Sequence, residues 1–312
     1  MTFNTPVLLI AWRRPHTTQQ VINAIRAVKP TRMFVACDGP NPSRPEEAAK
    51  VRATREVIER EIDWPCTIER RYSEVNQGCK VGVSRAINWF FDQVEDGIIL
   101  EDDCVPHPDF FHFCSTLLDV YREDERVWTI TGDNFQNGQK RGDGSYYFSR
   151  YNHIWGWATW RRAWQHYERD MPFWPEWKLS EDWAKKLPNP AERRYWLKVF
   201  DRVYAGMIDT WDYSWTASVW YRAGLTATPN RNLVRNIGFG QDGAHTKKGG
   251  SELENMAVEP LGEIVHVDNV VQDDIADAYV FQHVFGGKYQ GLKGLPRRIR
   301  RKFNRLYPAF DR

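Results

Sequence analysis

The sequence has no excess of charge of either sign. Its 43 Lys and Arg residues nearly balance its 41 Asp and Glu residues, and the formal net charge is +2. Proteins that bind nucleic acid through its phosphates usually carry a clearly basic surface or segment. The overall charge therefore gives no indication of a nucleic-acid partner, and we expect none.

Cysteine is scarce, and its pattern argues against two kinds of site. The five cysteines are odd in number and show no CxxC spacing: Cys37, Cys66, Cys79, Cys104 and Cys114. A disulfide framework and a zinc site both need more regular spacing than this. The cysteines therefore favour a reducing compartment and indicate no zinc.

Long apolar runs are also missing. The N-terminal run at residues 7–11 is far shorter than the roughly 20 apolar residues of a membrane-spanning helix, and no charged segment precedes it as in a signal peptide. We therefore expect a cytoplasmic protein. Residues 296–307 mix Lys and Arg with Ile, Phe, Leu and Tyr. This composition suits peripheral contact with the inner face of a membrane, and it equally suits a solvated basic helix or tail.

Tryptophan, in contrast, is abundant. Aromatic residues make up 14% of the chain and include 15 Trp. Large aromatic faces either fill a core or stack against flat ligands such as sugar rings. The stretch WGWATWRRAW at residues 155–164 is interpreted as the floor of a sugar or acceptor pocket, with a Trp-packed helix N-terminus as the alternative.

Strands and helices alternate through the first half of the chain. Apolar runs at residues 7–11, 33–37 and 97–100 predict strands, and residues 67–71 look like a further strand. Helical patterns at residues 21–28, 45–60 and 84–92 lie between them. This alternation predicts an α/β fold with a central, mostly parallel sheet flanked by helices. The second half departs from this rhythm, with a predicted helix at residues 191–205 and a Gly-containing loop at residues 236–250.

Three consecutive acids follow the strand predicted at residues 97–100. We call Glu101, Asp102 and Asp103 the acidic triplet. Adjacent carboxylates at the end of a buried strand repel one another, so they need a compensating cation. Hard oxygen ligands suit Mg²⁺ or Mn²⁺, and such an ion would leave coordination sites for substrate phosphates. The alternative is a solvated acidic turn.

The triplet and its surroundings resemble a known family. The segment IILEDDCVPHPDFF, residues 98–111, resembles the acidic motif of the N-acetylglucosaminyltransferase I group and of bacterial HlpA-like glycosyltransferases. Weaker resemblances cover residues 7–14, 34–39, 76–91, 156–164 and 211–245. The resemblance implies the GT-A fold of nucleotide-diphospho-sugar transferases over residues 1–285. Residues 1–135 would form the nucleotide-sugar-binding half and residues 136–285 the acceptor half, with residues 286–312 as a basic C-terminal tail.

The resemblance also implies roles for particular residues of the donor site. Asp103, the last acid of the motif, would bind the metal, while Glu101 and Asp102 would face the nucleotide and sugar. Arg13 and Asp38 would contact the donor, the latter through the base. A structural salt bridge is the alternative for Arg13, and turn capping is the alternative for Asp38.

Two further cations precede or begin the helix predicted at residues 84–92. Lys80 and Arg85 follow Asn76-Gln77-Gly78, where they could meet a diphosphate or a sugar hydroxyl. Ordinary surface charge is the alternative for both residues.

Asp212 is the candidate general base. An inverting sugar transferase needs a base beside the acceptor hydroxyl, and a carboxylate desolvated by aromatic neighbours, as in the segment TWDYSW, suits this role. A helix N-cap is the alternative, and Asp209 is the nearest rival. The resemblance suggests that the loop at residues 236–246 closes over the donor. His245 in this loop could contact phosphate or complete the metal shell, or be a bystander.

Taken together, the sequence predicts a metal-dependent, inverting glycosyltransferase. It would move a hexose or N-acetylhexosamine from a nucleoside diphosphate sugar, with UDP favoured, to a glycan or glycolipid acceptor. A noncatalytic carbohydrate-binding protein would explain the Trp content but not the acidic triplet. A sugar nucleotidylyltransferase normally has a Gly-rich loop after the first strand, which is absent here. A dehydrogenase is disfavoured because no G-x-G-x-x-G follows that strand.

Overall fold

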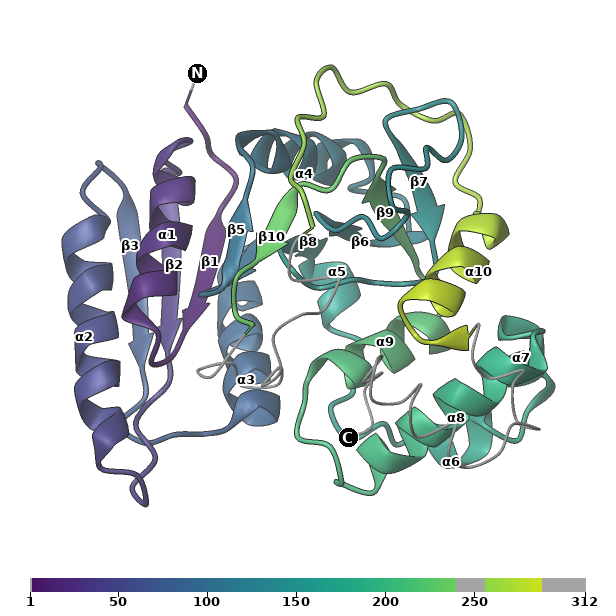
Figure 1. Cartoon of the computed structure of the whole chain (residues 1–312), viewed down its shortest axis with the longest axis horizontal. Coiled ribbons are helices and arrows are strands. Elements are labelled where there is room, and N and C mark those ends of the chain that lie inside the picture. The colour runs from purple at the N-terminus through teal and green to yellow at the C-terminus, as the bar shows by residue number, and fades with distance from the viewer. Residues whose placement is uncertain (1, 240–255, 288–312) are drawn as a thin grey trace, which may run out of the picture.

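A computed structural model describes residues 2–239 and 256–287 (Figure 1). The strands are β1 (Val7–Ala11), β2 (Arg32–Cys37), β3 (Thr67–Tyr72), β4 (Asp96–Glu101), β5 (Cys104–Pro106), β6 (Val127–Thr131), β7 (Tyr146–Ser149), β8 (Trp157–Trp160), β9 (Leu225–Pro229) and β10 (Val234–Asn236). The helices are α1 (Pro15–Arg26), α2 (Glu46–Glu61), α3 (Cys79–Phe91), α4 (Pro108–Val120), α5 (Arg161–Trp164), α6 (Trp174–Trp177), α7 (Glu181–Lys186), α8 (Pro190–Tyr204), α9 (Asp212–Tyr221) and α10 (Asp274–His283).

A single eight-stranded sheet runs through the molecule in the order β3-β2-β1-β4-β8-β6-β9-β7. The strands β3, β2, β1 and β4 are mutually parallel, and β6 is parallel to β9. Strand β8 is antiparallel to both of its neighbours, and β7 is antiparallel to β9. The predicted α/β fold is therefore confirmed, and its parallel character is strongest in the first half of the chain.

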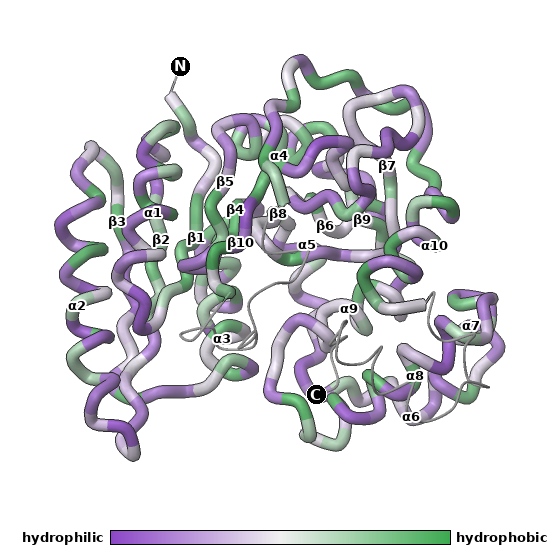
Figure 2. Tube along the Cα trace, viewed as in Figure 1, coloured by the Kyte–Doolittle hydropathy of each residue, from purple (hydrophilic) through white to green (hydrophobic). Residues whose placement is uncertain are grey.

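Helices cover both faces of this sheet. The apolar side chains of α1, α2 and α4 share one core cluster with one face, while α3 and the helices of the second half share another cluster with the opposite face. Figure 2 shows that β1 is coloured as hydrophobic, whereas α2 carries many hydrophilic residues. Strands β1 and β2 contain continuous apolar runs because both of their faces are buried, whereas the edge strand β3 is partly exposed and carries charged residues.

Local sequence signals explain where several elements begin. Helix α1 starts with Pro15 at its first position, where the missing N–H is no loss. Helix α4 is capped by His107, whose Nδ1 accepts a hydrogen bond from the backbone N–H of Asp109 at 3.1 Å. Gly78, in the left-handed region with φ of 80°, precedes α3 and lets the chain turn into the helix.

Most predicted elements are confirmed, with three differences. Helix α1 begins at Pro15, six residues before the helical pattern at residues 21–28. Helix α3 begins at Cys79, five residues before its predicted start, because it follows directly after the Gly78 turn. The Trp-rich stretch at residues 155–164 forms the central strand β8 and the short helix α5, and its side chains Trp157, Trp160 and Trp164 are buried in the core. Of its tryptophans, Trp155 alone is half-buried rather than buried.

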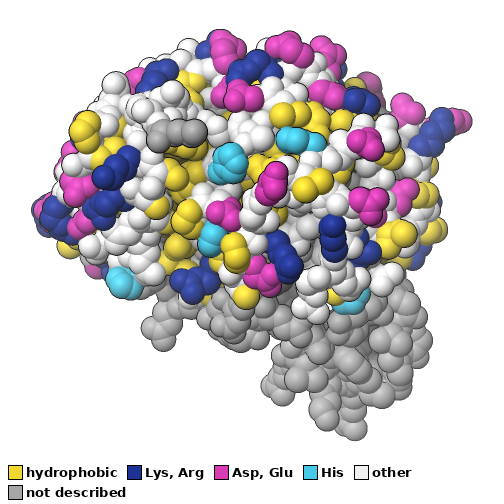
Figure 3. Space-filling model, turned by 90° about the horizontal axis from the view of Figure 1, so that it is seen from above, with side chains coloured by type: hydrophobic (Ala, Val, Ile, Leu, Met, Phe, Trp, Pro, Cys, Tyr) yellow, Lys and Arg dark blue, Asp and Glu magenta, His cyan; other side chains and the backbone are white. Residues whose placement is uncertain are grey.

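The described surface is mixed in charge. Figure 3 shows Lys and Arg side chains interspersed with Asp and Glu on one face. No helix within residues 2–239 and 256–287 is long and apolar enough to cross a membrane. The basic C-terminal segment predicted to touch a membrane lies outside the described residues.

Candidate active site

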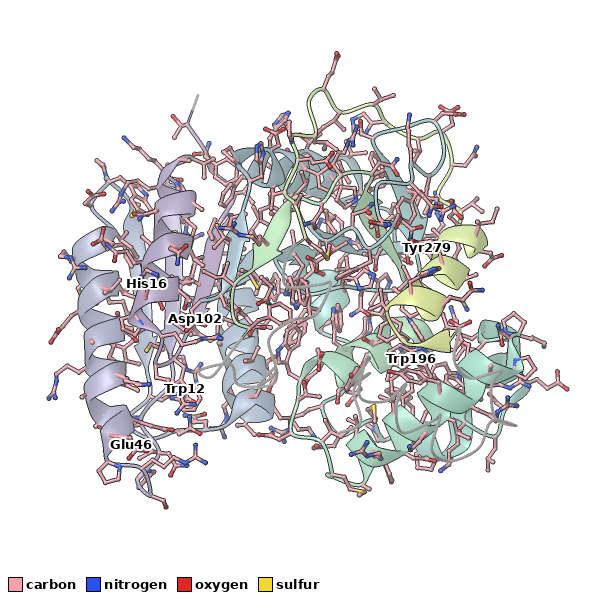
Figure 4. All side chains as sticks on the ribbon, in the orientation of Figure 1. Trp12, His16, Glu46, Asp102, Trp196 and Tyr279 are labelled. Atoms are coloured by element: carbon pink, nitrogen blue, oxygen red, sulfur yellow. The ribbon has the colours of Figure 1, made fainter. Side chains whose placement is uncertain are left out.

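The acidic triplet lies where the parallel strands end. Strands β1, β2 and β4 run in the same direction, so their carboxyl ends meet at one edge of the sheet. Glu101 is the last residue of β4, and Asp102 and Asp103 follow it. The chain leaving β1 contacts them directly, since the backbone N–H of Trp12 donates to Asp102 Oδ2 at 3.1 Å (Figure 4).

Arg14 supplies the cation that the triplet needs. Its guanidinium donates to Asp102 through Nη2, and to Asp103 Oδ2 through Nη1 at 2.6 Å. The side chain of Arg14 is 15% exposed, and those of Asp102 and Asp103 are 3% and 13% exposed. Burial acts to lower the pKa of Arg14, but the charges of Asp102 and Asp103 outweigh it and raise that pKa above its usual value. The two carboxylates and the guanidinium therefore form a buried ion-pair network.

Glu101 has a strongly raised pKa. Burial, followed by the charges of Asp103, Asp102 and Asp212, raises its pKa to about 8, although Arg14 acts to lower it. Burial also raises the pKa of Asp102. A carboxyl group with such a pKa is mostly protonated at neutral pH, so Glu101 can donate a hydrogen bond as well as accept one.

The described residues do not offer the predicted divalent ion a ready set of ligands. No group of three or more His, Cys, Asp and Glu side chains within the described ranges is arranged to hold a metal. The oxygens of Asp102 and Asp103 converge on Arg14 instead. His245, the residue expected to complete the metal shell, lies outside the described residues.

The segment after β10 closes one side of the triplet. The N–H of Ile237 donates to the backbone oxygen of Asp103 at 2.8 Å. A Cβ on Gly238 would lie 1.9 Å from Asp103 Oδ2 and 2.8 Å from Arg14 Nη1. A side chain at position 238 would therefore displace Asp103 or Arg14, because the backbone there lies directly against the ion-pair network.

The structure brings Asp212 to the same edge. It is the first residue of α9, and its Oδ1 accepts hydrogen bonds from the Tyr213 N–H at 2.9 Å and from Thr210 Oγ1. Its charge is among those that raise the pKa of Glu101, which places the two carboxyl groups within electrostatic reach of each other. The more exposed Asp209 accepts from the backbone N–H of Lys80 at 3.3 Å, at the start of α3.

Arg13 and Asp38 are placed in structural contacts. The guanidinium of Arg13 pairs with the buried Glu47 of α2, and its Cζ lies 4.1 Å from the centre of a Trp12 ring. Asp38 follows β2 and accepts hydrogen bonds from the N–H groups of Gly39 at 2.8 Å and Gln77 at 3.0 Å. The structure does not bring Arg13 to the triplet, and Asp38 organises the loop ahead of α3.

Lys80 and Arg85 point to partners of their own. Lys80 Nζ lies 3.0 Å from Asp170 Oδ1, and Arg85 Nη1 donates to Gln77 Oε1 at 2.9 Å. Both residues belong to α3, whose first turn faces Asp209. Lys80 is thus held near the Asp212 side of the site, whereas Arg85 is held by the Asn76-Gln77-Gly78 loop.

Sequence reasoning missed two residues of this edge. Arg14 is adjacent to Arg13, and nothing in the sequence distinguishes which of the two turns toward the triplet. Asp133 follows β6 and is fully buried. A run of β-branched and aromatic residues at 127–131, followed by Gly-Asp-Asn, repeats the pattern of a strand that ends in an acid. This pattern predicts an acid at the sheet edge and could have identified Asp133.

Comparisons with known proteins add remote similarities of fold. No protein-family model matches the sequence. A 4-diphosphocytidyl-2C-methyl-D-erythritol synthase from Anaerococcus prevotii is 8% identical over 72% of this chain and 88% of its own, with a TM-score of 0.35. A mannosyltransferase from Pyrobaculum calidifontis, in complex with GDP-mannose and Mn²⁺, is 10% identical over 71% of this chain and 73% of its own, with a TM-score of 0.33. A mannose-1-phosphate geranyltransferase from Thermus thermophilus is 10% identical over 75% and 76%, with a TM-score of 0.34. No residue of the site is assigned from these structures.

Proposed function

We propose that this chain is a glycosyltransferase of the GT-A type, of the kind that the acidic motif resembles. It would transfer a hexose or N-acetylhexosamine from a nucleoside diphosphate sugar, with UDP as the nucleotide, to a hydroxyl of a glycan or glycolipid, with inversion at the anomeric carbon. One observation carries the proposal: the acidic triplet, its buried counter-ion Arg14 and the helix-terminal Asp212 converge at the carboxyl edge of the sheet.

Asp212 is proposed as the general base. A carboxylate is basic enough for this step, because the acceptor hydroxyl loses its proton late in an oxocarbenium-like transition state. The hydroxyl oxygen would attack the anomeric carbon from the side opposite the diphosphate, its proton would pass to Asp212, and the bond to the diphosphate would break. The hydrogen bond from the Tyr213 N–H fixes the direction in which the carboxylate points.

Arg14 is proposed to hold the leaving diphosphate. A guanidinium presents five N–H donors in a planar fork, so it can retain contact with Asp102 or Asp103 while turning others toward phosphate oxygens. The protonated Glu101 would present a hydrogen-bond donor beside the same oxygens. The triplet would therefore orient Arg14 and tune the charge of the site.

The predicted Mn²⁺ or Mg²⁺ does not fit the described acids as they stand, because Asp102 and Asp103 are both engaged by Arg14. No step of the proposed reaction is assigned to a metal. The Mn²⁺ arms of the experiments below measure directly whether the ion adds to donor binding.

The first test is a thermal-shift panel of UDP-, GDP-, CMP- and dTDP-sugars, each with and without Mn²⁺. A ligand that binds only the folded chain at a hundredfold excess over its Kd adds about 2.7 kcal/mol of stability. We expect one nucleotide family, UDP, to raise the Tm, and Asp103→Ala to abolish that shift. No shift with any nucleotide sugar would contradict the proposal.

A second measurement separates binding from catalysis. Asp212→Asn should keep the rise in Tm with nucleotide sugar, because asparagine has the shape of aspartate. The rate of transfer should fall about 10²- to 10⁴-fold, because the amide cannot act as the general base. Asp209→Asn is the matched control, and it should retain both properties. Equal rates for Asp212→Asn and the wild type would remove Asp212 from the mechanism.

The same assay distinguishes a sugar nucleotidylyltransferase and a noncatalytic carbohydrate-binding protein. A nucleotidylyltransferase would exchange labelled pyrophosphate into a nucleoside triphosphate in the presence of a sugar nucleotide, whereas a glycosyltransferase releases nucleoside diphosphate. A carbohydrate-binding protein would bind glycans without releasing either product. We expect release of nucleoside diphosphate that depends on an acceptor glycan.

A further inference from the structure

A buried acid lies at the same edge of the sheet without a full set of partners. Asp133 follows β6, and its side chain is 0% exposed. Its Oδ2 accepts a hydrogen bond from the backbone N–H of Trp155 at 2.9 Å, while its Oδ1 has no hydrogen-bond partner among the described residues. Burying a polar atom without a hydrogen-bond partner is unfavourable, so this oxygen indicates a missing polar group.

Strand order explains how Asp133 comes to the triplet. Strands β4 and β6 are both antiparallel to the intervening β8, so they run in the same direction and their carboxyl ends share one edge. The Cys104 Sγ donates to Asp103 Oδ1 at 3.5 Å. Asp133 lies two residues beyond the end of β6, and the triplet begins at the last residue of β4, so both lie at this edge.

A second side chain without partners comes from the neighbouring segment. Asn152 is 5% exposed, and neither its amide oxygen nor its amide nitrogen has a partner among the described residues. The segment at residues 152–156 runs beside the segment at residues 132–136, since the Gly132 N–H donates to the Gly156 oxygen at 2.8 Å. Two adjacent segments thus each carry a buried polar side chain that the described fold does not satisfy.

Aromatic rings accompany these polar groups. The Phe135 ring lies 4.4 Å from the His153 ring and 5.4 Å from the Trp155 ring, measured between centroids. The half-buried Trp155 also meets Phe239 edge to face at 5.8 Å, on the segment that closes the triplet. Apolar ring faces beside hydrogen-bonding groups are the surroundings that a pyranose ring prefers.

The chemistry of the two segments favours an uncharged ligand. Residues 132–136 read GDNFQ and residues 152–156 read NHIWG, with no Lys or Arg in either. A phosphate would need cations, whereas sugar hydroxyls need a mixture of donors and acceptors. The Asn152 amide supplies both donors and an acceptor, and the Asp133 carboxyl group adds oxygens that accept; burial raises the pKa of Asp133.

We propose that Asp133 and Asn152 form a subsite that hydrogen-bonds the hydroxyl or acetamido groups of the transferred sugar and so determines which sugar is accepted. This inference rests on the proposed function, and it names the residues of that site that determine sugar specificity. The triplet and Arg14 would hold the diphosphate, while the Asp133–Asn152 subsite would bind the sugar ring attached to it.

The test compares nucleotide with nucleotide sugar in single variants. Thermal shifts are measured for UDP, UDP-glucose, UDP-galactose, UDP-N-acetylglucosamine and UDP-N-acetylgalactosamine. GDP, CMP and dTDP are each measured in the same way, alone and as their nucleotide sugars. In the wild type, we expect one sugar nucleotide to stabilise more than its bare nucleotide. In Asp133→Ala and Asn152→Ala, the thermal shift with the bare nucleotide should persist. The affinity for the preferred nucleotide sugar should fall at least tenfold, or the preference should move to another sugar.

Two further variants control for loss of folding. Asp133→Asn retains the shape of the side chain and an oxygen that can accept from the Trp155 N–H. The variant should therefore fold, and it should lose only part of the extra affinity that the sugar adds to the nucleotide. Thr226→Val removes a different buried oxygen that lacks a partner among the described residues, on β9, and should leave sugar recognition unchanged. Variants at 133 and 152 that keep the wild-type sugar effect would overturn the inference, since water alone would then satisfy these groups.

Failure of the proposed function is a separate outcome. If no nucleotide or nucleotide sugar stabilises the wild type, the same variants are examined with methyl glycosides by saturation-transfer NMR. A wild-type signal lost in Asp133→Ala and Asn152→Ala supports a sugar subsite in a protein that is not a glycosyltransferase. Absence of any signal from the wild type overturns the subsite as well.

Discussion

Replacing Arg14 by methionine removes the guanidinium from the ion-pair network and leaves Asp102 and Asp103 facing each other. Methionine has a similar length and no charge, so the packing changes little while the electrostatics change completely. Both carboxylates are at least four-fifths buried, so water offers them little compensation. The perturbation therefore isolates the role of the internal cation.

The expected loss is large because the pair is buried. Removing one partner of a buried ion pair typically costs about 3–5 kcal/mol, since the remaining charges lose their compensation. Part of this loss would be relieved if one carboxylate took up a proton. Arg14→Lys should fall between the wild type and Arg14→Met, because an ammonium group cannot form the two-pronged contact with both acids.

Urea denaturation followed by tryptophan fluorescence measures this change. Arg32→Met is the matched control, because Arg32 pairs with Glu69 at 3.5 Å in a more exposed setting, and its loss should stay below about 1 kcal/mol. A saturating concentration of Mn²⁺ should stabilise Arg14→Met more than the wild type, because the freed acids regain a cation. An Arg14→Met free energy of unfolding within about 0.5 kcal/mol of the wild type would refute the view that Arg14 neutralises the triplet.

Two further predictions test other parts of the structure. Gly238→Ala should lower stability by about 1–3 kcal/mol and weaken nucleotide-sugar binding, because its Cβ would lie 1.9 Å from Asp103 Oδ2. Gly82→Ala in α3 meets its nearest atom at 3.4 Å and should be neutral or stabilising; equal effects for the two changes would contradict the close approach at 238. Burial lowers the pKa of His153 to about 3, so the unfolded chain binds a proton below about pH 6.5 that the folded chain excludes. The free energy of unfolding should therefore fall as the pH drops from about 6.5 toward 3, by at most about 1.4 kcal/mol per pH unit. Because His153 is only half-buried, solvent should reduce this slope. Urea unfolding of His153→Phe should show a shallower decline over this range, and parallel profiles for variant and wild type would contradict the assignment.

The sequence determined the local structure well where burial is simple. The first four predicted strands are confirmed. Strands β1, β2 and β4 lie inside the sheet and contain continuous apolar runs, whereas β3 is a partly exposed edge strand of mixed composition. The strand at residues 97–100 also predicted that the acids after it would lie at the carboxyl edge. By contrast, WGWATWRRAW was open to more than one interpretation, since Trp suits both a core and a sugar pocket, and its placement as β8 depends on β4 and β6 lying on either side.

The sequence also indicated the chemistry of the triplet but not its partner. Three acids require a cation wherever they are buried, which follows from electrostatics alone. The sequence predicted a metal in that role, whereas the structure provides Arg14. Successive side chains at the end of a strand point in different directions, and only the position of Glu47 on α2 and of the triplet on β4 decides which arginine turns to which acid.

Only the tertiary structure decided which distant residues complete the site. Asp212 lies more than a hundred residues after the triplet in the chain, and it reaches the same edge because α9 packs against the face of the sheet that also holds α3. Asp133 joins the edge because β8 runs antiparallel between β4 and β6. Side-chain periodicity records whether a residue is buried, so the strands and the acidic turn could be predicted. Strand order depends on how whole elements pack together, and no local pattern in the sequence encodes it.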